Sequence, residues 1–190
     1  MEFNTLINLF KFLEDKEGNQ SPFTIFKISD SLSIVGLNDK ENFMNQEGQL
    51  ASKEWFDFVG GFTGDDLALV GLNDKYNLVN REGQFISKEW FNRIGDFKNG
   101  FARVGLNDKY NLINKEGQLL SKEWFDGIGD FKEGFAGVEL NNKMNFINKE
   151  GQLLSKEWFD FINNFYDGFA MVELNDERYK LSTTGELTKM

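Results

Sequence analysis

The sequence of 190 residues contains no cysteine, no histidine and one proline, Pro22. The lack of cysteine excludes disulfide bonds and thiol chemistry. Without histidine the chain also has neither the usual zinc and copper ligands nor a Ser-His or Cys-His catalytic pair. No apolar run approaches the roughly 20 residues of a membrane-spanning helix. The N-terminal residues lack a basic leader and a small-residue cleavage site, so we expect a cytoplasmic location.

Positive charge is in deficit, with 21 Lys and Arg against 31 Asp and Glu and a net charge of −10. Lysines lie among acids in every part of the chain and form no basic stripe. We therefore expect neither nucleic acid nor an anionic membrane surface as a partner. Calcium loops need several carboxylates at alternating positions, whereas the Asn-Asp-Lys turns place a cation there. We expect no metal and no other cofactor.

A four-residue segment, Lys-Glu-Trp-Phe, begins at Lys53, Lys88, Lys122 and Lys156. This period of 34 or 35 residues predicts a repeat architecture, in which each copy buries apolar surface against its neighbours. Copies can be aligned along the chain as five segments: 21–52, 53–87, 88–121, 122–155 and 156–187.

Each copy consists of short apolar stretches separated by turn residues. In residues 88–121 an extended or bulged segment precedes strands at 101–106 and 109–114, and residues 118–120 start a further strand. Asn107 and Asp108 form the hairpin turn, because both residues tolerate positive φ. The pattern predicts an all-β protein, in which each copy is an antiparallel meander too small to be stable alone.

Residues 1–20 differ from the repeats, since their apolar residues fall on one helical stripe. We expect an N-terminal helix that caps the first repeat, with a docking helix as the alternative. The whole chain is predicted to form an open, solenoid-like array of five repeats. The alternative is a small five-bladed propeller, for which 34 residues per blade are few.

Differences between copies separate core positions from surface positions. Columns such as Val35, Val70, Val104, Val138 and Val172 keep their apolar character and are expected in the core. The column of Asn42, Asn77, Asn111 and Asn145 is expected to satisfy backbone groups at turns or to form ladders. Other columns vary, and plain solvent exposure explains this more simply than a binding face does. The binding candidates are Leu69, Tyr76, Arg103, Tyr110, Glu139, Met144, Met171, Glu173 and Arg178.

Residues 100–117, Gly-Phe-Ala-Arg-Val-Gly-Leu-Asn-Asp-Lys-Tyr-Asn-Leu-Ile-Asn-Lys-Glu-Gly, resemble the WG-repeat (KWG-repeat) family of bacterial proteins. The similarity extends over about residues 23–187. One departure is that Tyr-Asn or Met-Asn replaces the Trp-Gly pair, as at Tyr110-Asn111. The resemblance implies an all-β repeat protein, from a bacterium or a bacterial virus, and brings no catalytic residues.

These observations favour a non-enzymatic scaffold that binds a protein partner along its repeat surface. The alternative is a carbohydrate-binding module that uses rows of aromatic residues, although the four Trp residues are more simply explained by packing. Paired carboxylates recur in every copy instead of once in a cleft, so we expect no enzyme. The oligomeric state is left open.

Overall fold

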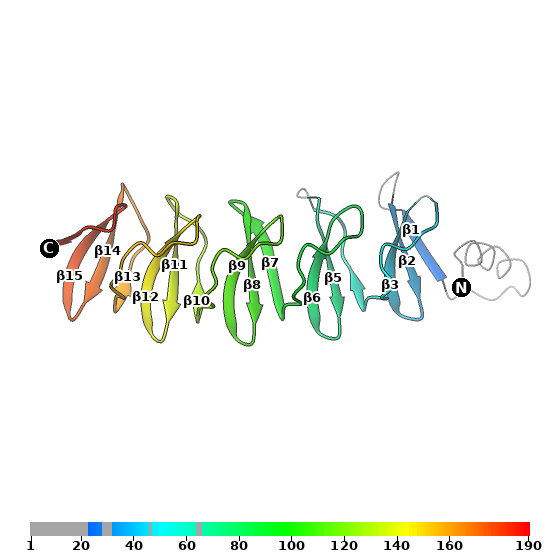
Figure 1. Ribbon diagram of the computed structural model, residues 1–190, viewed down its shortest axis with the longest axis horizontal. Coiled ribbons are helices and arrows are strands. Elements are labelled where there is room, and N and C mark those ends of the chain that lie inside the picture. Colours follow the sequence, from blue (N-terminus) through cyan, green and yellow to red (C-terminus); the bar gives the residue numbers. More distant parts are fainter. Residues whose placement is uncertain (1–22, 28–31, 46, 64–65) are drawn as a thin grey trace, which may run out of the picture. The chain divides into compact units, whose positions relative to one another are not determined.

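The computed structural model describes residues 23–27, 32–45, 47–63 and 66–190 of the chain. The chain divides into two compact units, residues 1–90 and 91–190, and each is described by itself. All regular elements of the described residues are β-strands, and no helix among them could cross a membrane (Figure 1). This confirms the all-β class, whereas the helix predicted in residues 1–20 lies outside the described residues.

The described part of the first unit contains two antiparallel sheets whose strand order follows the chain. Block 1 is formed by β1 (Phe23–Lys27), β2 (Leu32–Leu37) and β3 (Lys40–Asn45). Block 2 is formed by β4 (Phe58–Val59), β5 (Ala68–Leu72) and β6 (Lys75–Val79).

The second unit contains three antiparallel sheets, each again in chain order. The strands of block 3 are β7 (Arg93–Lys98), β8 (Phe101–Leu106) and β9 (Lys109–Asn114), and those of block 4 are β10 (Gly127–Ile128), β11 (Phe135–Leu140) and β12 (Lys143–Asn148). Block 5 has four strands: β13 (Phe161–Ile162), β14 (Phe169–Leu174), β15 (Glu177–Ser182) and β16 (Leu187–Lys189).

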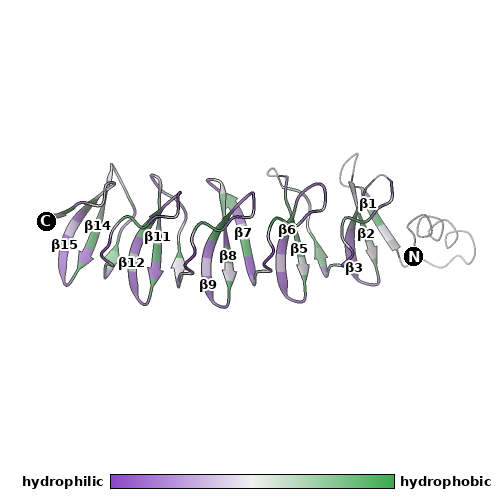
Figure 2. Ribbon diagram, viewed as in Figure 1, coloured by the Kyte–Doolittle hydropathy of each residue, from purple (hydrophilic) through white to green (hydrophobic). Residues whose placement is uncertain are grey.

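Turn chemistry explains where the strands begin and end. Asn107 and Asp108 both have positive φ, 50° and 60°, and connect β8 to β9 by the two-residue turn that right-twisted strands favour. The hydrophilic hairpin ends are visible as purple segments in Figure 2. A register shift between Ile94 and Phe97 confirms the predicted bulge. The strand predicted at 118–120 is wrong, because only a single bridge, Ile113 with Leu119, forms there. After Leu119 the chain leaves the sheet and continues toward Trp124 of the next repeat.

Consecutive blocks of one unit share an apolar layer. Phe125 is 1% exposed, and its backbone N–H donates to the Tyr110 carbonyl at 3.0 Å while its carbonyl accepts from the Tyr110 N–H at 2.8 Å. Leu112 of block 3 lies in one buried cluster with Phe125 and Ile128 of block 4. The same pairing joins Met144 to Phe159 in this unit and Glu41 to Phe56 in the other. A block is therefore completed by the chain that follows it.

Most of the predicted core columns are buried, and the Val column is 0–2% exposed throughout. The column of Ile25, Val59, Ile94, Ile128 and Ile162 is less uniform: Val59 and Ile128 are buried, Ile94 and Ile162 are half-buried, and Ile25 is 53% exposed. Ile25 lies on β1, and no described residue precedes this strand to cover its face.

Candidate functional site

The binding candidates lie in rows that run across the sheets, with one row in each block. Arg93 on β7 pairs with Gly105 on β8, and Gly105 pairs with Tyr110 on β9. Paired residues of an antiparallel sheet point to the same face, so these residues line up side by side. The pairing of Gly105 with Tyr110 is the register that the predicted two-residue turn at Asn107-Asp108 gives. In each block, we call the surface formed by its row, together with the residue two positions earlier on the middle strand, the row face of that block.

The same pairing gives the other four rows. They are Thr24–Gly36–Glu41 in block 1, Phe58–Gly71–Tyr76 in block 2, Gly127–Glu139–Met144 in block 4 and Phe161–Glu173–Arg178 in block 5. Their first members, including Arg93, were not among the predicted site residues. The first strand is only two residues long in three blocks. This is too short for an alternation of inward and outward side chains to be recognised in the sequence.

Plain solvent exposure is too simple a description of the row face. Of the nine candidates, Arg103 and Arg178 are exposed, and the other seven are half-buried. The row face also contacts the following block. Arg103 Nη1 donates to the Ile128 carbonyl at 3.2 Å, and a Cβ built on Gly137 would lie 3.1 Å from Ile162 Cδ1.

Variation within a row is also coupled across the strands. A Cβ built on Gly105 would lie 3.3 Å from the Tyr110 ring, so the ring lies across the glycine, as an aromatic neighbour does over a sheet glycine elsewhere. Gly71 and Tyr76 repeat this arrangement in block 2. Where the middle residue is Glu173, it pairs with Arg178 at 2.9 Å. In blocks 2, 3 and 5, a change at the middle position of the row is therefore accompanied by a matching residue on the third strand.

The row face is hollowed in blocks 3 and 4. The hollow of block 3 measures about 340 Å³ and is lined by Arg93, Ile94, Gly95, Arg103, Gly105 and Tyr110. The hollow of block 4 measures about 230 Å³, and its lining includes the equivalent residues Gly127, Gly137, Glu139 and Met144. One position of the fold therefore carries a basic and aromatic lining in one block and an acidic lining in the next.

The constant Asn column fastens each third strand to the turn that follows. Asn111 is fully buried, and its Nδ2 donates to the carbonyls of Ser121 at 2.8 Å and Glu123 at 3.0 Å. Its Oδ1 accepts from the Leu112 N–H at 2.8 Å. The bonds recur at Asn42, Asn77 and Asn145. The expectation that these amides satisfy backbone groups is confirmed, and this is the position at which Asn replaces the glycine of the Trp-Gly pair.

A carboxylate connects neighbouring blocks at the hairpin ends. Asp126 forms an ion pair with Lys109 of the preceding block and accepts from the Asn141 N–H of its own block at 2.8 Å. These hydrogen bonds, from Lys109 first and from the Asn141 backbone second, lower the pKa of Asp126 below its ordinary value. Lysine and a turn N–H lower the pKa of Asp57 and of Asp160 in the same way.

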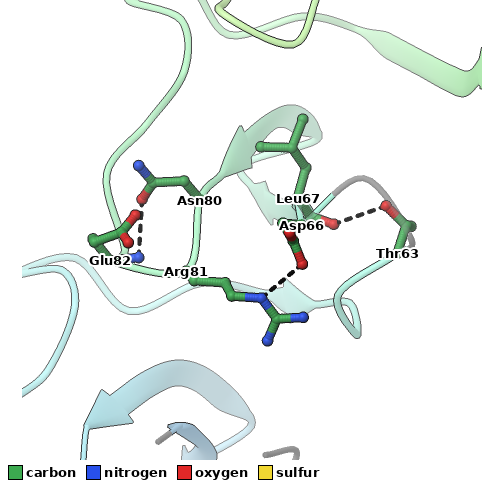
Figure 3. A network of polar contacts seen from close by, with 6 residues as sticks. All are labelled: Thr63, Asp66, Leu67, Asn80, Arg81 and Glu82. Carbon is green, nitrogen blue, oxygen red and sulfur yellow. Dashed lines mark hydrogen bonds and ion pairs between the residues drawn. The ribbon is translucent and has the colours of Figure 1, made fainter. Parts of the chain in front are cut away.

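A second constant Asn column, Asn45, Asn80, Asn114 and Asn148, also serves the turns, as Figure 3 shows for Asn80. Asn80 Oδ1 accepts from the Glu82 N–H at 3.1 Å, while Arg81 Nε donates to Asp66 Oδ1 at 2.8 Å. Nearby, Thr63 Oγ1 donates to the Leu67 carbonyl at 3.2 Å. The described residues contain no cluster of three or more acidic side chains that could hold a metal ion.

Three of the four tryptophans contribute to packing. Trp90, Trp124 and Trp158 are half-buried, and each contacts a buried cluster that contains the Phe of an earlier repeat. Trp124 lies 6.4 Å from Phe91 between ring centroids. The packing interpretation of these residues fits this arrangement, and it leaves the carbohydrate alternative without support.

Comparison with known protein families places the repeats in a known group. A family model described as "WG containing repeat" matches residues 78–110, 112–143 and 146–177, which make up about half of the chain. Each match begins within a third strand and ends within the third strand of the following block, so it includes parts of two consecutive blocks. No curated protein matches the sequence.

Several solved structures resemble the chain at low sequence identity. Kluyveromyces lactis Hsv2 is 10% identical, with a TM-score of 0.37 over 88% of this chain and 62% of that one. A protein of unknown function from Bacteroides caccae is 12% identical, with a TM-score of 0.29 over 87% and 79%. The Neurospora crassa Pan2 WD40 domain is 11% identical, with a TM-score of 0.32 over 87% and 64%. The chain thus spans less than two thirds of the length of Hsv2.

Proposed function

Since the chain belongs to the family of proteins built from WG-containing repeats, we propose that it is a non-enzymatic scaffold that binds a protein partner through its row face. The observation that carries this proposal is the change of chemistry along an otherwise constant frame. Backbone, Asn column and buried Phe recur from block to block, whereas the rows differ. Partly exposed Tyr, Arg and Met side chains beside hollows are also the residue types that anchor protein interfaces.

The state of the acidic residues supports a role without catalysis. The aspartates that recur at the hairpin ends are paired with lysine, and hydrogen bonding lowers the pKa of Asp57, of Asp126 and of Asp160. A general acid needs the opposite shift, toward the working pH. These carboxylates join blocks, which is a structural task.

We also propose that the blocks form an open array. β16 pairs along β15, with Leu181 opposite Leu187, and the Met190 N–H donates to the Arg178 carbonyl at 3.0 Å. In blocks 1, 3 and 4 the equivalent edge, at Glu41, Tyr110 and Met144, receives the Phe of the next repeat. A closed ring would need the same edge for the first repeat, so its occupation within block 5 favours open ends.

The proposal can be tested by affinity capture with purified full-length chain and quantitative mass spectrometry. A double variant, Arg103→Ala with Tyr110→Ala, removes two anchors of the row face. The control variant Lys122→Ala removes an exposed side chain that is the same in every Lys-Glu-Trp-Phe segment. We expect the double variant to capture about tenfold less of the protein partner than the unaltered chain, and the control to capture the same amount. Circular dichroism should show that both variants are folded. Equal capture by all three chains would refute the proposal.

A further inference from the structure

Block 3 differs from the other repeats in its charge. Residues 88–121 contain six Lys and Arg and four Asp and Glu, so this segment has a net charge of +2 in a chain of net charge −10. Each of the other four repeat segments has a net charge between −2 and −4. Two of the extra positive charges, Arg93 and Arg103, occur at positions where the equivalent residues of the next repeat are glycines, Gly127 and Gly137.

The sheet brings these two arginines to one hollow. Arg93 is opposite Gly105 across β7 and β8, and Arg103 is two residues before Gly105 on β8, so both lie on the row face. Tyr110, opposite Gly105 on β9, completes the rim. They line a hollow of about 340 Å³, whose other lining residues include Gly95 and Gly105.

Both guanidinium groups are available to a ligand. Arg103 donates once, to the Ile128 carbonyl, and its guanidinium carbon is 6.0 Å from the centre of the Tyr110 ring. These two contacts hold the group at the hollow while most of its five N–H donors stay unused. Neither Arg93 nor Arg103 forms an ion pair with any described carboxylate, although both side chains belong to an acidic protein.

We propose that the block 3 hollow binds the carboxylate of an Asp or Glu side chain in an acidic peptide segment of the partner. A pair of arginines suits a carboxylate, because the planar guanidinium can donate two parallel N–H bonds to its two oxygens. The ring of Tyr110 would cover the apolar stem of the same side chain. This inference rests on the proposed function and names the chemistry that one block recognises.

Nearby acids limit where the ligand can lie. Asp96 and Asp130 line a second, smaller hollow of about 210 Å³ that also includes Arg103. Asp130 is neutralised by Lys98 at 3.0 Å. A carboxylate is therefore directed toward Arg93 and Tyr110, away from Asp96. In block 4 the equivalent row contains Glu139, so the same ligand would be repelled there, and the specificity belongs to block 3.

The experiment uses immobilised random nonapeptides with a fixed central Glu, Gln or phosphoserine, probed with the full-length chain at low salt. The test variant is Arg93→Gln with Arg103→Gln. The matched control, Lys122→Gln with Lys132→Gln, removes the same charge at exposed positions that do not line the hollow. We expect the unaltered chain and the control to retain Glu peptides about fivefold more than Gln peptides, and the test variant to lose that preference.

Three results would overturn the inference. They are equal retention of Glu and Gln peptides by the unaltered chain, a preference confined to phosphoserine peptides, and a Glu preference that survives in the test variant. In each of these cases the proposed function stands if the affinity capture still depends on Arg103 and Tyr110. A capture that does not depend on them refutes the proposed function itself. As a direct readout, the Nε–H signals of Arg93 and Arg103 in nuclear magnetic resonance spectra should shift with the best Glu peptide and not with its Gln counterpart.

Discussion

Replacing the buried amide of Asn111 with Ala should destabilise the protein more than any change at a surface Asn. The side chain makes four hydrogen bonds to backbone groups, at 2.8, 3.0, 2.8 and 3.4 Å, and is fully buried. Each such bond contributes about 1 kcal/mol net, and a partner left unsatisfied costs more. Because the Ser121 and Glu123 carbonyls lie at a partly exposed turn, water can replace part of the loss. We therefore expect a loss of about 3 kcal/mol.

The control is Asn114→Ala. Asn114 is half-buried, and its side chain bonds only Gln118, with Oδ1 accepting from the Gln118 N–H at 2.8 Å. Water can reach these groups, so the expected loss is about 0.5–1 kcal/mol. A second variant, Asn111→Asp, keeps the size of the side chain but turns an oxygen toward two carbonyls. It should cost at least as much as the alanine.

Urea unfolding, followed in parallel by tryptophan fluorescence and circular dichroism, measures these differences. The two probes should agree if the unit unfolds cooperatively. Hydrogen exchange should also accelerate at the Leu112 N–H, which loses its acceptor in Asn111→Ala. A loss below about 1 kcal/mol, or one no larger than that of Asn114→Ala, would refute the view that this amide fastens one repeat to the next.

Two further predictions concern a turn glycine and an ion pair. Gly151→Ala should cost about 2–4 kcal/mol, because φ is +77° and the added Cβ would meet the Leu120 carbonyl oxygen at 2.1 Å. The control is Gly134→Ala, where φ is +87° but no atom lies within 4 Å of the added Cβ. We expect it to lower the free energy of unfolding by only about 1 kcal/mol, the cost of the backbone conformation alone. Equal losses in the two variants, measured by thermal unfolding, would contradict the clash at Gly151. The pKa of Asp126 is lowered in the folded protein. Its contribution to the free energy of unfolding is therefore present above the ordinary Asp pKa of about 4 and is lost as pH falls through the lowered pKa. Asp126→Asn should therefore flatten the decline of melting temperature in acid, and an unchanged decline would count against the pairing with Lys109.

Much of the fold could be predicted because the copies repeat the same local signals. The Asn-Asp turn at 107–108 determines the hairpin, its register and the pairing of Gly105 with Tyr110. The strand predicted at 118–120 was wrong. Its apolar residues suggest a strand, but the chain turns at Ser-Lys-Glu directly afterwards, and only one bridge forms. Nothing in the local pattern shows that a buried amide ten residues earlier holds that turn.

The candidate site was less predictable than the fold. Arg103 and Tyr110 were identified from their variation between copies, but Arg93 was not, because its strand pairs through a bulge that disturbs the period of two. The compensation between a glycine and the ring beside it is likewise a property of paired strands. It becomes visible in the sequence only after the register is known.

The pairing of Phe125 with Tyr110 has a consequence for how such a chain can grow. The sequence repeat and the folded block do not have the same boundaries, because the first residues of a repeat, such as Phe125, pair with the last strand of the block before it. Inserting one more period of 34 residues regenerates both halves of this joint at once. Lengthening then leaves no additional strand edge open to other molecules, so gene duplication can extend the series without creating a new site of aggregation.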